Sequence, residues 1–379
     1  MAEKSAGRLA WLDGLRAIAI LLVIARHVFD RPFAMLYDRV IVSDGVMTAL
    51  VLVLGSIGWA GVGIFFVISG YLVAAGAALA VRDGRFFAGE FLAKRAVRVF
   101  LPALLFLVFW RLVMPPPDDS LFATLANFLF FANYTDSNWL APFWSLDVEA
   151  HFYVAVALLA PLAIRCGDMR RLGWCLAGGA AVFALAKLGV AASGAMPDQD
   201  FYTYSHWQVD FFAAGAALRL VFDGRTLPRS VSVYGVPLAI LALAAAGIVL
   251  IGASDSAGLF VLSEVLVLIA AVALCAGAGG GAARFFGARP LRTIGTISFS
   301  VYIVHLPLIE TLQPWLLSVA KPFAGDPLVT YLAMLVPAIA LSLGAGALLY
   351  QAVERPAYRW HQRIRIRPRS VLGPVQAAR

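Results

Sequence analysis

Two side chains that can take part in chemistry lie in the first apolar stretch, LDGLRAIAILLVIARHVF. Arg16 and His27 are 11 residues apart, which places them about 20° apart around an α-helix and about 16 Å apart along it. An imidazole can act as a general base, and a guanidinium can bind phosphates in a bidentate manner. The structural alternative is an interfacial arginine and a histidine hydrogen-bonded within a helix bundle.

A carboxylate is expected at the depth of His27. Glu149 lies in FWSLDVEAHFYV, within about one turn of the start of its predicted helix. A carboxylate beside an imidazole holds its tautomer and raises its basicity, so the sequence predicts His27 and Glu149 as a catalytic pair. The alternative is a carboxylate in water at the rim. Asp147 is a weaker candidate, because it points about 160° away from Glu149.

A cationic cluster stands in the segment FLAKRAVRVFLP. Lys94, Arg95 and Arg98 could bind phosphate groups, or they could be basic residues that anchor a helix at the cytoplasmic face of a membrane. Pro102 follows and should kink or locally unwind the helix, which would open space beside the cluster.

Three further polar residues are predicted to position a substrate. Tyr302 and His305 follow Ser298 at helical spacing in TIGTISFSVYIVHLP and share one face of a helix. Ser69 lies near the middle of another apolar stretch, in GVGIFFVISGYL. Ordinary packing, with a hydrogen-bonded tyrosine tip and small residues between helices, remains open as the alternative for these positions.

Membrane-spanning helices are the elements that must position these residues. The chain has 379 residues, of which 61% are hydrophobic and 14% charged, too few charges to cover a water-exposed surface of this size. We therefore predict an all-α polytopic membrane protein. Ten stretches are long and apolar enough to cross: 12–30, 58–80, 97–113, 146–166, 172–192, 208–222, 233–252, 257–277, 293–315 and 328–350.

The distribution of basic residues predicts the orientation. With ten crossings and a cytoplasmic N-terminus, most of the 30 Lys and Arg residues fall in cytoplasmic loops, and the C-terminus is cytoplasmic too. The net charge of +8 is thus explained by the lipid bilayer, without a nucleic acid partner. The stretch 121–132 is too short to span and is expected to be interfacial or re-entrant. The alternative is that this stretch crosses the membrane as a short helix.

Several common catalytic motifs are absent from the sequence. It contains no G-x-S-x-G, H-E-x-x-H or P-loop motif, and its five histidines are scattered without ligand spacing, so we expect no metal site. The three cysteines, Cys166, Cys175 and Cys275, are expected to be small packing residues without a disulfide.

The ordered set of motifs resembles the acyltransferase-3 family of integral membrane proteins. Any one motif is weak, but together they run in the family's order from about residue 8 to residue 360. They are Arg16-x10-His27, GVGIFFVISGYL, Lys94-Arg95-x-x-Arg98 with Pro102, WSLDVEAHFY, ISFSVYIVHLP and VERPAYR.

The resemblance implies an O-acyltransferase in a bacterial inner membrane. Its donor would be a cytoplasmic acyl-CoA, most often acetyl-CoA, and its acceptor a hydroxyl of a cell-surface or exported carbohydrate or glycolipid. Arg16, Arg95 and Arg98, with Lys94, would hold the donor's phosphates, and His27, oriented by Glu149, would deprotonate the acceptor. Residues 8–360 would form the membrane domain and 361–379 a basic cytoplasmic tail. A sugar transporter or flippase and a non-catalytic scaffold are the alternatives.

Overall fold

Helices make up most of the described part of the chain, with turns and short irregular segments between them, and no strand occurs in it. The computed structural model describes residues 10–37, 46–82, 87–114, 118, 120–135, 137–165, 168–194, 201–222, 229–251, 256–278 and 282–364. The predicted all-α class is confirmed for these residues.

Long apolar helices dominate the bundle. Among the described residues, eight helical segments are long and apolar enough to cross a membrane: Thr48–Ala74, Ala88–Val113, Ala141–Ala160, Met169–Ala192, Val233–Ile251, Ala257–Ala278, Arg289–Thr311 and Pro327–His361. The other two predicted stretches are also helices, α1 (Ala10–Val28) and α10 (Val209–Phe222). The former is rich in charge and the latter is only 14 residues long. The chain is a multi-pass membrane protein, and the number of ten crossings and the cytoplasmic ends stay predictions.

The remaining helices have the following bounds. The longer ones are α3 (Val46–Ile57), α4 (Ala60–Arg82), α6 (Leu101–Val113), α8 (Trp144–Arg165), α9 (Met169–Ala192), α11 (Arg229–Ile251), α12 (Ala257–Ala278), α14 (Arg289–Thr311) and α16 (Pro327–Leu349). The shorter ones are α2 (Ala34–Tyr37), α5 (Ala88–Arg95), α7 (Leu121–Phe128), α13 (Ala283–Phe286), α15 (Gln313–Ala320) and α17 (Arg355–His361).

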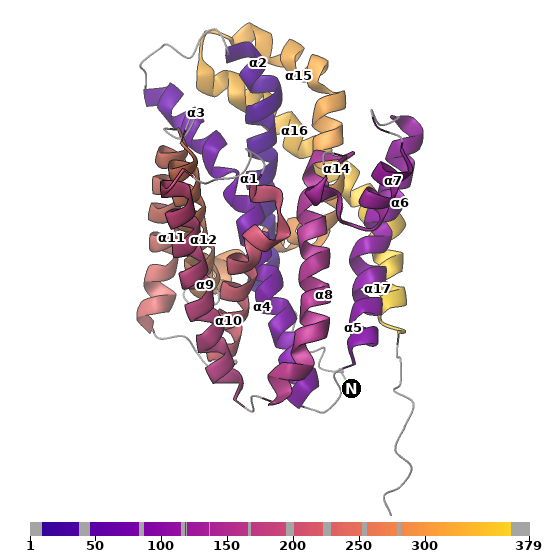
Figure 1. The fold of residues 1–379 in the computed structure, drawn as a ribbon. Helices are drawn as coiled ribbons and strands as arrows, with labels where there is room; N and C mark the ends of the chain where they lie inside the picture. Colours follow the sequence, from indigo (N-terminus) through magenta and orange to yellow (C-terminus); the bar gives the residue numbers. More distant parts are fainter. Residues whose placement is uncertain are drawn as a thin grey trace, which may run out of the picture.

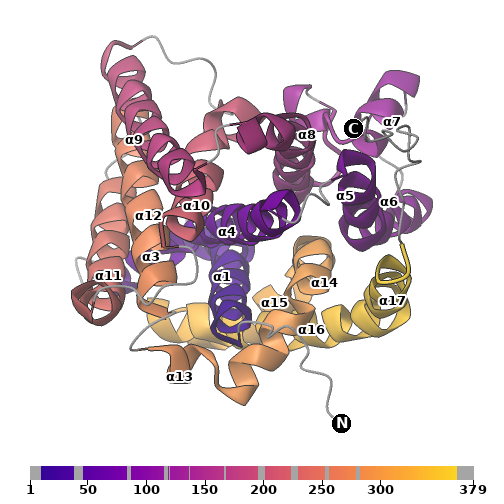
Figure 2. The ribbon, with the colours of Figure 1, turned by 90° about the horizontal axis from the view of Figure 1, so that it is seen from below.

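The helices α1 and α4 stand at the centre of the bundle (Figures 1 and 2). On one side, α9, α10, α11 and α12 pack into a layer, and buried side chains of α1, α4, α10 and α12 form one apolar core. A second core joins α1 to α14 and α16. The helices α5, α6 and α8 lie across from α14 and α17 on the other side (Figure 2).

Two short helices refine the predicted spans. The segment before the predicted span 58–80 is helical as well, since α3 is separated from α4 only by a turn at Gly58 and Trp59. The sequence analysis assigned no element to the 12 residues of α3. The stretch 121–132 contains the eight-residue α7, whose first turn is capped by Ser120 accepting a hydrogen bond from the Ala123 amide. A helix of this length rises about 12 Å, so it cannot span.

Three helices widen into a π-helical turn beside a proline. The turns are Phe29–Phe33, Ala96–Phe100 and Tyr350–Glu354, and Pro32, Pro102 and Pro356 lie within or just after them. A proline has no amide hydrogen to donate to the carbonyl four residues before it, so the helix inserts a residue and continues with a longer hydrogen bond. The local unwinding predicted at Pro102 occurs as the π-helical turn Ala96–Phe100.

A buried polar network ties α9, α10 and α12 together. The Lys187 ammonium lies 2.8 Å from an Asp210 carboxylate oxygen and 3.7 Å from a Glu264 oxygen, and the three side chains are at most 2% exposed. Lys187 also donates to the Trp207 carbonyl, while the Trp207 indole and the Gln208 amide donate to Glu264. The Lys187 ammonium thus forms ion pairs with two buried carboxylates.

A glycine lets α1 and α14 approach closely. A Cβ atom at Gly295 would lie 1.7 Å from the Asp13 carbonyl oxygen, which belongs to the backbone of α1. Backbone atoms cannot turn away as a flexible side chain can, so any side chain at position 295 must push the two helices apart.

Gly295→Ala should therefore destabilise the fold by about 1–3 kcal/mol and lower activity, because α1 and α14 carry facing residues of the site described below. Thermal unfolding in detergent measures the first effect. Gly344→Ala on α16 is the matched control, since no atom lies within 4 Å of its added Cβ. Equal stability of the two variants would contradict the close-approach explanation.

Candidate active site

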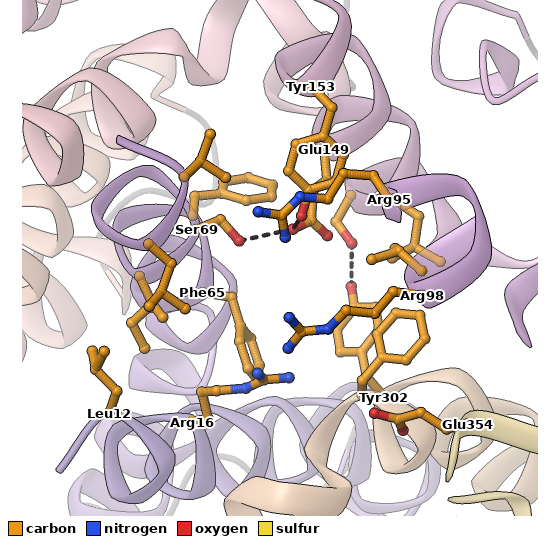
Figure 3. A pocket seen from close by; sticks show the side chains of 18 of the residues that line it. Leu12, Arg16, Phe65, Ser69, Arg95, Arg98, Glu149, Tyr153, Tyr302 and Glu354 are labelled. Carbon is orange, nitrogen blue, oxygen red and sulfur yellow. Dashed lines mark hydrogen bonds between the residues drawn. The ribbon is translucent and has the colours of Figure 1, made fainter. Parts of the chain in front are cut away.

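A cavity of about 490 Å³ is lined by residues of α1, α4, α5, α8, α14 and α17 and of the widened turns Ala96–Phe100 and Tyr350–Glu354. Its volume falls in the range of small-molecule binding sites. Figure 3 shows side chains from several helices pointing into it. The polar residues that line it are Asp13, Arg16, Ser69, Arg95, Arg98, Ser145, Glu149, Tyr153, Thr296, Tyr302, Tyr350, Glu354 and Tyr358.

Three guanidinium groups from two separate segments converge on this cavity (Figure 3). Arg16 comes from α1, Arg95 ends α5, and Arg98 lies in the widened turn Ala96–Phe100. Arg16 donates to the Ser298 hydroxyl at 3.1 Å. Arg95 lies over the Phe91 and Tyr153 rings, and Arg98 lies over the Tyr358 ring.

Within the described residues, none of Arg16, Arg95 and Arg98 forms an ion pair with a carboxylate. Arginine side chains that are partly withdrawn from water gain most from an anionic partner that accepts several of their hydrogen bonds. The cavity is therefore equipped to bind an anion with several oxygen atoms.

Lys94 was predicted to join this cluster but does not line the cavity. It forms an ion pair with Glu90 on its own helix, one turn earlier. Neighbouring residues of a helix point about 100° apart, so Lys94 and Arg95 face different surroundings.

Glu149 and Ser69 line the same cavity. The Ser69 hydroxyl donates to Glu149 Oε1 at 2.8 Å, and the Tyr153 hydroxyl donates to the same oxygen. Asp147, by contrast, is 2% exposed and accepts a hydrogen bond from the Asn133 amide, which anchors the loop after α7. The expected difference in direction between Asp147 and Glu149 is thus present.

The expected contact between His27 and Glu149 does not occur. The His27 ring instead lies against the His305 ring, with centroids 5.0 Å apart and planes at 88°. His27 Nδ1 donates to the Val23 carbonyl at 3.0 Å, and neither histidine lines the cavity. A backbone carbonyl, rather than a carboxylate, holds the His27 tautomer.

The physical reason is a difference in depth. Ser145 on α8 and Tyr302 on α14 are hydrogen-bonded at 2.6 Å and so lie at one level. From that level Glu149 lies about 6 Å toward the Arg16 end of α1, and His305 lies about 4.5 Å toward the His27 end. Glu149 and the histidine pair are therefore about 10 Å apart along the bundle.

Tyr302 separates the cavity from the two histidines. Its ring is 6% exposed, lines the cavity beside Phe65 at a centroid distance of 6.1 Å, and contacts the His305 ring at 5.4 Å. The predicted polar face of α14 is present. Along this face Ser298 contacts Arg16, Tyr302 lies next, and His305 contacts His27.

Glu354 is a cavity residue to which the sequence analysis gave no role. It ends the widened turn Tyr350–Glu354 and lines the cavity (Figure 3). Its carboxylate accepts a 2.6 Å hydrogen bond from Ser300. The sequence did contain a signal for this residue, because Glu354 belongs to the family motif VERPAYR. Tyr153 is a second such residue, in WSLDVEAHFY.

No group of three or more metal-ligating side chains occurs among the residues with described positions. Cys175 and Cys275 are free thiols, and Cys166 lies outside the described residues.

The fold and the cavity define a helical membrane protein with an arginine-lined site for an anionic ligand. In a comparison with protein families, residues 9–350 match the acyltransferase domain of the acyltransferase-3 family. The match covers most of the chain, so the chain belongs to this family and is a membrane acyltransferase. No curated protein and no solved structure matches it.

Proposed function

We propose that the protein transfers an acyl group, most simply acetyl, from a cytoplasmic acyl-CoA to a hydroxyl of a carbohydrate or glycolipid at the outer face of a bacterial inner membrane. The observation that carries this proposal is the convergence of Arg16, Arg95 and Arg98, without carboxylate partners, on one cavity of about 490 Å³. The phosphate groups of coenzyme A are anions of the kind that such a cluster binds.

The donor would extend from the arginines toward Tyr302. Its pantetheine arm carries amide groups and a hydroxyl, which need hydrogen-bond partners once they leave water. Ser69, Glu149 and Tyr302 provide donors and acceptors along this path. In this proposal Glu149 positions the donor's arm and does not orient His27.

His27 would then act on the acceptor. Because its Nδ1 donates to the Val23 carbonyl, its Nε2 carries the lone pair that can take a proton. The acceptor hydroxyl loses its proton to Nε2, its oxygen attacks the thioester carbonyl carbon, and the carbon–sulfur bond breaks. His305 would keep the His27 ring in place.

Arg98→Gln tests the donor site. The Michaelis constant for acetyl-CoA should rise about 10- to 100-fold, because one charge-assisted contact to phosphate is lost. The assay measures transfer of labelled acetyl from acetyl-CoA to a mixture of methyl glycosides by the purified protein in vesicles. Arg171→Gln is the control, because Arg171 lies on α9 with its side chain 87% exposed.

An unchanged Michaelis constant in Arg98→Gln would refute the arginine cavity as the donor site. Uptake or flipping of a sugar by the same vesicles without any acyl donor would instead favour the transporter alternative.

A further inference from the structure

The two histidine rings are held in the same manner. His27 Nδ1 bonds to the Val23 carbonyl at 3.0 Å, and His305 Nδ1 bonds to the Tyr302 carbonyl at 2.7 Å. A carbonyl oxygen only accepts hydrogen bonds, so both Nδ1 atoms carry the ring proton and both Nε2 atoms are acceptors.

At their Nε2 atoms, the two rings therefore present two hydrogen-bond acceptors and no hydrogen-bond donor. His305 is 0% exposed, and its Nε2 has no hydrogen-bond partner. The described residues provide no partner for His27 Nε2 either. A buried polar atom such as His305 Nε2 is unfavourable without a partner, and a single proton on His27 Nε2 would supply one through an N–H···N hydrogen bond.

No carboxylate contacts either ring within the described residues. Arg26 pairs with Asp30 at 2.6 Å, and Arg31 pairs with Glu310 at 3.6 Å, so the nearby charges are already matched. The Tyr331 hydroxyl donates to the Ala25 carbonyl. A protonated His27 has the other imidazole as its available hydrogen-bond acceptor.

We propose that His305 is a positioning residue that accepts a hydrogen bond from His27 once His27 has taken a proton, so that the two imidazoles together hold one proton. This inference rests on the proposed function, because the proton would come from the acceptor hydroxyl. The ring centroids are 5.0 Å apart, a separation that leaves room for one N–H···N hydrogen bond between the two imidazoles.

The proton balance is complete. The acceptor O–H bond breaks and its proton forms the Nε2–H bond of His27, while the oxygen forms a bond to the acyl carbon. The carbon–sulfur bond breaks, and the sulfur of coenzyme A leaves as a thiolate. The His27–His305 pair holds the proton until the thiolate takes it, which regenerates two neutral rings.

Two substitutions at position 305 test this role. His305→Phe keeps an aromatic ring but has no acceptor, so kcat should fall about 10- to 100-fold with the Michaelis constant for acetyl-CoA unchanged. His305→Gln places an amide oxygen near the position of Nε2 and should restore most of the rate. A simple packing role predicts the opposite order, because phenylalanine fills the space better than glutamine.

A spectroscopic measurement separates this inference from the proposed function. The protein is labelled with ¹⁵N-histidine in detergent, and the His27 and His305 signals are assigned with variants at each position. In the wild type, one added proton should shift both Nε2 signals together, whereas in His305→Phe the His27 signal should titrate alone.

The outcomes are distinct. Independent titration of the two histidines, or a wild-type kcat in His305→Phe, overturns the shared proton even if acetyl transfer is observed. Coupled titration in a protein that transfers no acyl group supports the pair and refutes the proposed function.

Discussion

Replacing His27 by alanine should reduce acetyl transfer by about 10²- to 10⁴-fold, the usual contribution of a general base. The donor should still bind, because His27 does not line the arginine cavity. The effect should therefore appear in kcat and leave the Michaelis constant for acetyl-CoA unchanged. Measurement of labelled acetyl transfer to methyl glycosides in vesicles, with binding of acetyl-CoA recorded separately, distinguishes the two quantities.

His206→Ala is the control for this experiment. His206 has an exposed side chain that is hydrogen-bonded to Tyr134, and it does not line the cavity. This variant should retain at least half of the wild-type rate. Full activity in His27→Ala would show that another group deprotonates the acceptor.

Lys187→Met should destabilise the protein by about 3–5 kcal/mol, because removal of one partner leaves buried charge uncompensated. In this variant Asp210 and Glu264, which are 1% and 2% exposed, would face each other without a cation. Thermal unfolding in detergent, followed by the loss of helical circular dichroism, measures the effect.

The matched control removes the two carboxylate charges together with the charge of the lysine. The triple variant Lys187→Met, Asp210→Asn and Glu264→Gln carries no net charge at this site and should recover much of the lost stability. If the triple variant were as unstable as Lys187→Met, the loss would be due to packing of the lysine stem. Activity is not expected to change in the triple variant, because none of the three residues lines the arginine cavity.

Much of the fold could be predicted from the sequence because a membrane leaves few choices for the backbone. Within the described residues, each of the ten predicted stretches is mostly helical. The periodicity of 3.6 residues also correctly grouped Ser298, Tyr302 and His305 on the face of α14 that meets α1. The sequence predicted Lys94, Arg95 and Arg98 as one cluster, and the family resemblance added Arg16. The three arginines line one cavity, whereas Lys94 does not.

The relative depth of residues on different helices could not be predicted. Periodicity describes rotation around one helix but contains no information about how far a neighbouring helix is shifted along the bundle. This is why Glu149 was expected beside His27 and instead bonds to Ser69 and Tyr153. The widened turns add a residue to a helix, which also changes the face on which later residues lie.

The packing of Phe65 against Tyr302 in the wall of the cavity has a consequence for the proposed function. A protein that takes one substrate from the cytosol and another from outside must not join the two aqueous phases, because ions would then flow down their gradients. In the proposed function, the apolar faces of these two rings would resist the passage of ions, since they offer an ion no replacement for its hydration shell. An acyl group is small and apolar, and it needs no such replacement. The proposed reaction would then combine chemistry across the membrane with an intact electrical barrier.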